Sequence, residues 1–149
     1  MLTPRSQQTP DEQGRSAPLR YGTVWDTTHA PIADARHAVR TLLAQAGLDP
    51  DHQPSQDAQL VVSELVTNAI RHAPGPGGLL LELTPDATLL RIAVHDSSPH
   101  PPRTRTLDPR RVGGHGLHLV TRLCDRMHTI TLATGKQVVT HVRLRNGAG

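Results

Sequence analysis

Apolar positions repeat with helical spacing most clearly between Ser55 and Ala73. In this segment they fall at 58, 61, 62, 65, 66, 69, 70 and 73, a spacing that gathers them on one face of an α-helix. A second helical repeat starts after Pro31 and stops at Gly47, residue types typical of a first turn and of a C-terminal cap. A third, shorter repeat covers Leu117–Leu123. The pattern therefore predicts three helices.

Short apolar runs bounded by turn residues predict five strands. They are Leu19–Trp25, Leu79–Thr84, Leu89–Val94, Met127–Ala133 and Gln137–Leu144. Strands that follow one another in hairpin pairs exclude a doubly wound parallel sheet, in which strands and helices alternate. We expect an α+β fold. It is a two-layer α/β sandwich in which three helices cover one face of a mixed, mostly antiparallel sheet.

Two segments fall outside this pattern. Residues 1–18 are rich in Pro, Gln, Ser and charge and show no period, so they cannot bury enough apolar surface to offset the entropy lost on ordering. We expect a disordered tail there, followed by one domain over residues 19–145. The segment Ser97–Arg111 is too long and too rich in proline for a regular element, and we expect a loop.

Composition narrows the classes of function. The chain has 149 residues, a formal net charge of +3, no Phe, one Trp and one Tyr, which disfavours nucleic-acid binders that stack bases on aromatic side chains. The lone Cys124 excludes an internal disulfide, fits a reducing cytoplasm and is expected as a small core residue. No stretch reads as a membrane span or a signal peptide. We expect a cytoplasmic protein without a membrane partner and without direct nucleic-acid contacts.

Three polar residues interrupt the strongest helical repeat at intervals of four. Glu64, Asn68 and His72 form a row along the helix, with neighbours about 6 Å apart along the axis. The row borders the apolar stripe, where burying a carboxylate or an amide without a hydrogen-bond partner costs free energy. One reading is a solvated helix face. The other is a Mg²⁺ site, because this ion prefers hard oxygen ligands.

Two further features carry candidate chemistry. Glycines cluster at Gly113, Gly114 and Gly116, at the start of the third predicted helix, where backbone N–H groups can bind phosphate. The alternative is a plain turn. Asp96 ends a predicted strand immediately before the long loop. Its carboxylate can accept a hydrogen bond from a ligand amine, or it can cap the loop.

The order of these motifs resembles the GHKL ATP-binding superfamily. The segment from Val62 to Ala73 is similar to its N box, in the form that this motif takes in the anti-sigma-factor serine/threonine kinase branch of high-GC bacteria. The segment after Val94 is similar to the G1 region of that branch, and Gly113–Val120 to its G2 box. The resemblance covers roughly Leu19 to Leu144, and it implies a Bergerat-type fold that binds ATP and Mg²⁺.

The resemblance also implies roles for single residues. It assigns Asn68 to Mg²⁺, Asp96 to the adenine amino group, and Glu64 to the role of general base or to the orientation of a water or hydroxyl. The phosphates would be framed by three glycines, Gly113, Gly114 and Gly116. It implies a kinase that phosphorylates an anti-sigma-factor antagonist and sequesters a sigma factor, and it allows a homodimer. The long loop carries Arg103, Arg105, Arg110 and Arg111 just before these glycines, so we expect a lid that bound triphosphate would order. The alternative is a loop that stays solvated in every state. Because Ser97 and Ser98 stand where many members have glycines, a non-catalytic ATP-binding interaction module is the alternative.

Overall fold

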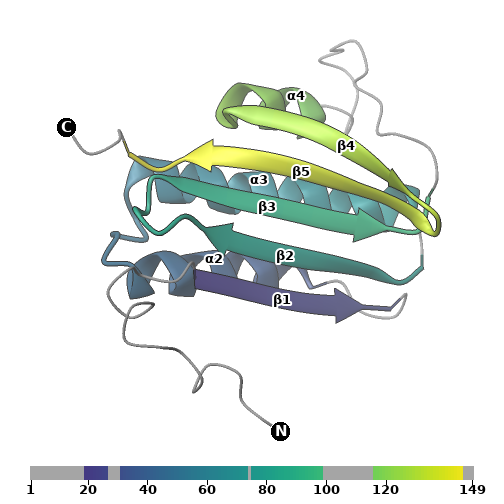
Figure 1. Cartoon of the computed structure of the whole chain (residues 1–149), viewed down its shortest axis with the longest axis horizontal. Coiled ribbons are helices and arrows are strands. Elements are labelled where there is room, and N and C mark those ends of the chain that lie inside the picture. The colour runs from purple at the N-terminus through teal and green to yellow at the C-terminus, as the bar shows by residue number, and fades with distance from the viewer. Residues whose placement is uncertain (1–18, 27–30, 74, 99–115, 146–149) are drawn as a thin grey trace, which may run out of the picture.

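A five-stranded sheet forms one layer of the computed structural model, which describes residues 19–26, 31–73, 75–98 and 116–145. The sheet order is β1-β2-β3-β5-β4, and all four pairings are antiparallel (Figure 1). The strands are β1 (Leu19–Trp25), β2 (Gly77–Leu83), β3 (Leu89–Asp96), β4 (Arg126–Leu132) and β5 (Gly135–Arg143). The ends of β3 and β5 therefore lie in the middle of the sheet and away from its edges.

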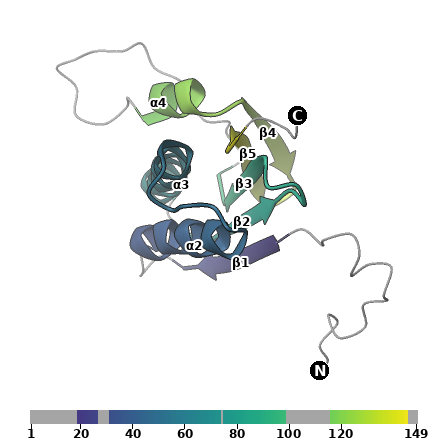
Figure 2. The same cartoon turned by 90° about the vertical axis from the view of Figure 1, so that its left-hand side faces the viewer.

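Three helices form the second layer, and all lie on the same face of the sheet (Figure 2). They are α2 (Ile32–Gln45), α3 (Gln53–His72) and α4 (Gly116–Leu123). The predicted two-layer α+β fold is confirmed, with element boundaries within about two residues of the expected ones. The expected N-terminal tail and most of the expected lid lie outside the described residues. No helix in the described part of the chain is long and apolar enough to cross a bilayer.

Alternating side chains build the core between the two layers. In β3 the fully buried Leu90 and Ile92 point to the helices, and the register with β5 aligns them with Val142 and Thr140. From α3, Val62 and Val66 are completely buried in the same cluster. Period-two burial in the strands and helical burial in α3 thus meet in one apolar layer, as the sequence pattern predicts.

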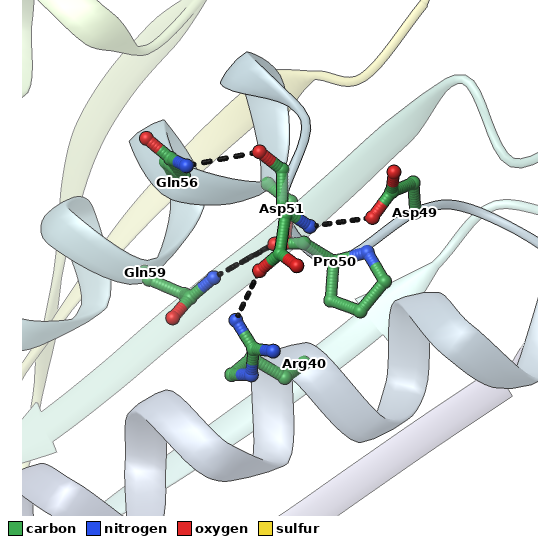
Figure 3. Close-up of polar contacts among 7 residues, drawn as sticks. Arg40, Asp49, Pro50, Asp51, Gln56 and Gln59 are labelled. Carbon is green, nitrogen blue, oxygen red and sulfur yellow. Dashed lines mark hydrogen bonds and ion pairs between the residues drawn. The ribbon is translucent and has the colours of Figure 1, made fainter.

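Polar contacts hold the connection between α2 and α3 (Figure 3). The Arg40 guanidinium of α2 donates to Asp51 Oδ1 at 3.1 Å. From α3, the side-chain amide of Gln56 donates to the backbone carbonyl of Asp51 at 2.9 Å, and that of Gln59 donates to the carbonyl of Pro50 at 3.3 Å. Side chains of both helices therefore donate hydrogen bonds to the same short turn. These contacts orient the first half of α3, whose second half carries the candidate chemistry.

Candidate functional site

The polar row on α3 lies at the border of the buried stripe, as the sequence predicts. Glu64 and Asn68 are half-buried, and His72 is exposed at the last residue of the helix. The apolar neighbours Leu65 and Ala69 are buried. The carboxylate and the amide therefore lie one helical turn apart, next to the core and still reachable by a ligand.

Within the described part of the chain, neither the Glu64 carboxylate nor the Asn68 amide has a hydrogen-bond or ion-pair partner. The half-buried Glu82, by contrast, pairs with Arg91 at 2.8 Å on the opposite face of the sheet. Half-buried oxygens without protein partners are available to a cation or to the groups around it. This donor set fits Mg²⁺, which takes a few hard oxygen ligands and keeps phosphate oxygens and waters as the others.

Asp96 is the last residue of β3, and it is only 4% exposed. Its Oδ1 accepts a hydrogen bond from Lys136 Nζ at 2.9 Å, and Lys136 is also 4% exposed. The backbone N–H of Ser98 donates to the same oxygen at 2.9 Å. The carboxylate that the resemblance assigns to adenine is thus one half of a buried ion pair that also caps the start of the long loop.

The register between β3 and β5 creates this ion pair. Asp96 and Lys136 are directly opposite residues, so both side chains emerge on the helix-covered face. The preceding Gly135 has a φ of +153°, and a Cβ at this position would overlap the backbone carbonyl oxygen of Asp96. Only glycine accepts both the conformation and the close approach. The first residues of β5 are therefore fixed against the last residue of β3.

These features gather at one end of the molecule. The arrow of β3 ends there, the C-terminal end of α3 points the same way, and α4 begins on that side (Figure 1). α3 packs against both β3 and α4. The Ser97 hydroxyl donates to the Pro76 carbonyl at 2.8 Å and so joins the end of β3 to the residue before β2. The C-terminal end of α3, the last residue of β3 and the first residues of β5 thus lie toward the same end of the fold.

The glycine cluster is only partly described. Gly116 is the first residue of α4. Gly113 and Gly114 lie outside the described residues, so their expected place around phosphate stays a prediction. Leu123 and Cys124, at the other end of α4, pack half-buried against the core, and burial raises the pKa of the Cys124 thiol. Cys124 therefore packs against the edge of the core just after α4, half-buried, where the sequence predicts a core residue.

Two features escaped the sequence reasoning. Lys136 is the single lysine of the chain, and no motif around it predicts an ion pair with Asp96. The second is a pair of stacked rings on the open face of the sheet, where His128 of β4 and His141 of β5 have centroids 6.1 Å apart. Burial lowers the pKa of His141, and the positive charges of Arg126 and Arg91 lower it further. Both features are cross-strand relations that only the register reveals.

Comparison with known proteins decides the family. The family model for the histidine kinase-like ATPase domain matches residues 26–145. The chain belongs to this family. The expected superfamily is thereby confirmed, and the matched range contains α3, the end of β3 and the glycine cluster in one ATP-binding domain.

A solved structure supports the same fold for the histidine kinase-like domain. The crystal structure of the RsbU and RsbW domains of Rv1364c from Mycobacterium tuberculosis is similar, with a TM-score of 0.60 and 23% sequence identity. The match covers 89% of this chain and 34% of that chain, so this chain spans about a third of its length. Among curated proteins no sequence match was found.

Proposed function

We propose that this histidine kinase-like domain is an ATP- and Mg²⁺-dependent serine/threonine kinase of the anti-sigma-factor type. It would act in the cytoplasm, phosphorylate an anti-sigma-factor antagonist and sequester a sigma factor. The observation that carries the proposal is the pair Glu64 and Asn68, half-buried on α3 without partners among the described residues. In a nucleotide-binding domain these are the groups free to work on a bound phosphate.

The side chains of the two α3 residues suit them to different roles in the reaction. The Asn68 amide oxygen is neutral and hard, and it would serve as a ligand of Mg²⁺. The Glu64 carboxylate, one turn away, can accept the proton of a serine or threonine hydroxyl as that oxygen attacks phosphorus. Bound Mg²⁺ would supply charge neutralisation for the phosphates. The protein would hold the metal ion in place and supply the general base.

The remaining roles rest on the resemblance. Asp96 would accept a hydrogen bond from the adenine amine, and Gly113, Gly114 and Gly116 would frame the phosphates with backbone N–H groups. The amino-acid sequence of the segment from Val62 to Ala73 supports the anti-sigma-factor branch. The fold similarity to a structure that contains an RsbW domain is consistent with that branch.

Two measurements test the proposal in sequence. Titration calorimetry with ATP, once with Mg²⁺ and once with a chelator, should show binding that weakens without the metal. Incubation with γ-labelled ATP, Mg²⁺ and a purified anti-sigma-factor antagonist should then transfer label to a serine or threonine of the antagonist. Glu64→Gln is the control that should bind ATP without transferring label. Absence of ATP binding would contradict the whole proposal.

One observation favours the alternative of a non-catalytic ATP-binding interaction module. Asp96, expected to read the base, already has Lys136 and the Ser98 backbone as partners. The same experiment separates the two functions. An interaction module would bind ATP but would leave the antagonist unlabelled at enzyme concentrations equal to those of the substrate.

A further inference from the structure

One face of the sheet carries none of the described helices, which all lie on the other face (Figure 2). We call this bare surface the open face; it is formed by every second side chain of each strand. Three of the four exposed large apolar side chains in the described part of the chain lie on it, namely Val24, Ile130 and Leu132. Val24 is 83% exposed. Exposed apolar side chains gathered on one face are typical of an interaction surface.

A hollow lies beside Val24 on the open face. It has a volume of about 500 Å³ and extends over β1, β2 and β3. Gly22 and Gly78 contribute no side chains to fill it, and Val24, Leu80 and His95 are among the residues that line it. An apolar side chain of another molecule can therefore enter the hollow and be buried there.

A row of charged side chains crosses the open face next to this hollow. The register aligns one residue from each strand, in the order Arg20, Glu82, Arg91, His141 and Arg126. Glu82 binds Arg20 at 3.1 Å and Arg91 at 2.8 Å. Arg126 is exposed and has no ion-pair partner among the described residues. Three guanidinium groups against one carboxylate leave this arginine row with a positive charge.

The spacing of the hollow and the arginine row matches that of an α-helix. Along β1 the open face carries Arg20, Gly22 and Val24, so the hollow begins one two-residue step from the row, or about 6.8 Å. Side chains four residues apart on a helix are separated by about 6 Å along its axis. A helix that lies along the strands can thus place apolar side chains in the hollow and carboxylates, one turn further, on the arginine row.

Charge makes a second copy of this chain a poorer occupant of the open face. The strands contribute one carboxylate to this face, Glu82, and two arginines already bind it. Two such faces in contact would bring unpaired guanidinium groups together, or would bury them against apolar side chains. The positive row instead favours a partner that supplies the missing carboxylates.

We propose that the open face is the docking surface for an amphipathic helix of a partner protein. Apolar side chains of that helix fill the hollow, and its carboxylates pair with the arginine row. The inference goes beyond the proposed function, because it names a second contact surface and uses neither the polar row of α3 nor the Asp96–Lys136 pair.

A synthetic peptide labelled with fluorescein is the probe for this surface. It is an alanine-based helix with two leucines one turn apart and two glutamates one turn beyond them. A second peptide has lysines in place of the glutamates and is otherwise identical. Fluorescence anisotropy with the full chain should give a dissociation constant below about 100 μM for the first peptide. The second should bind about tenfold more weakly or worse at low salt, since it repels the arginine row.

Two substitutions test the two halves of the surface. Val24→Asp places a carboxylate beside the hollow, and Arg126→Ala removes the unpaired cation. Each should weaken binding of the first peptide by about fivefold or more. The matched controls make the same exchanges on the helical layer: Leu60→Asp at an exposed position of α3, and Arg36→Ala at an exposed position of α2. Both controls should stay within about twofold of the wild-type protein.

Methyl NMR spectra locate the bound peptide. Signals of Val24, Leu80 and Ile130 on the open face should shift, whereas that of Leu60 should not. Absence of binding up to about 1 mM, equal affinity for the two peptides, or shifts confined to the helical layer would overturn the proposal. So would sedimentation of the free protein as a dimer that Val24→Asp separates, because a second copy would then occupy the face. None of these measurements depends on ATP, so their failure leaves the proposed function intact.

Discussion

Gly135 of β5 lies directly against the backbone carbonyl of Asp96, with no space for a Cβ between the two strands. Gly135→Ala must move the start of β5 or leave its positive φ, and either change strains the sheet where the Asp96–Lys136 pair forms. We expect the free energy of unfolding to fall by about 1–3 kcal/mol, measured by urea denaturation.

Gly22→Ala in β1 is the matched control for that substitution. A Cβ there would meet Leu80 Cδ1 at 3.7 Å, an ordinary contact. Its effect should stay within about 0.5 kcal/mol. Equal losses in the two variants would contradict the close approach described for Gly135.

Asn68→Ala should weaken the dependence of ATP binding on Mg²⁺. The variant loses a half-buried amide oxygen on α3 and keeps the helix intact, since alanine is a good helix former. We expect the ratio of ATP dissociation constants without and with Mg²⁺ to shrink by about tenfold or more. Asn68→Asp keeps an oxygen ligand and should retain the dependence. Equal affinity with and without Mg²⁺ in the wild-type protein would remove Asn68 from the metal site.

Glu64→Gln should slow phosphoryl transfer far more than it weakens ATP binding. The amide keeps the size of the side chain but cannot accept a proton, and a general base acts mainly in the transition state. We expect kcat to fall by about 10²- to 10⁴-fold while calorimetric ATP affinity changes little.

Glu82→Gln serves as the control for Glu64→Gln, because Glu82 pairs with Arg20 and Arg91 on the opposite face of the sheet. Its turnover should match that of the wild-type protein. Parallel losses of binding and turnover in Glu64→Gln would instead identify Glu64 as a structural residue.

His141 should make the fold sensitive to mild acid. Burial and nearby arginines hold its pKa below the usual value, so the folded state keeps the ring neutral where the unfolded chain binds a proton. The resulting stability is complete above about pH 6.5 and is lost as the pH falls below it. His141→Gln should therefore flatten the decline of unfolding free energy between about pH 7 and pH 5.

The comparison for His141 is His37→Gln, in which an exposed ring on α2 is removed. Urea denaturation at a series of pH values measures both variants against the wild-type protein. A wild-type curve parallel to that of His141→Gln throughout this range would show that His141 does not contribute.

Local pattern was enough to predict the elements and the polar row. The helical spacing around Glu64 and Asn68 is a property of one continuous segment, so it can be read without knowing what packs against it. The pairing of Asp96 with Lys136 could not be read that way. It joins residues 40 positions apart, and a shift of one residue in the register would send one of the two side chains to the opposite face.

The order of the sheet has a consequence for how the chain can vary in length. β3 and β5 are central neighbours, and Asp96, Lys136 and Gly135 clamp them together at the site. The segment that leaves β3 after Asp96 and returns at α4 therefore begins and ends on elements that the sheet and α3 already hold. Doubling the length of such a connection costs only about 0.6 kcal/mol in closure entropy. Related chains can therefore lengthen, shorten or exchange this segment with little effect on the stability of the fold.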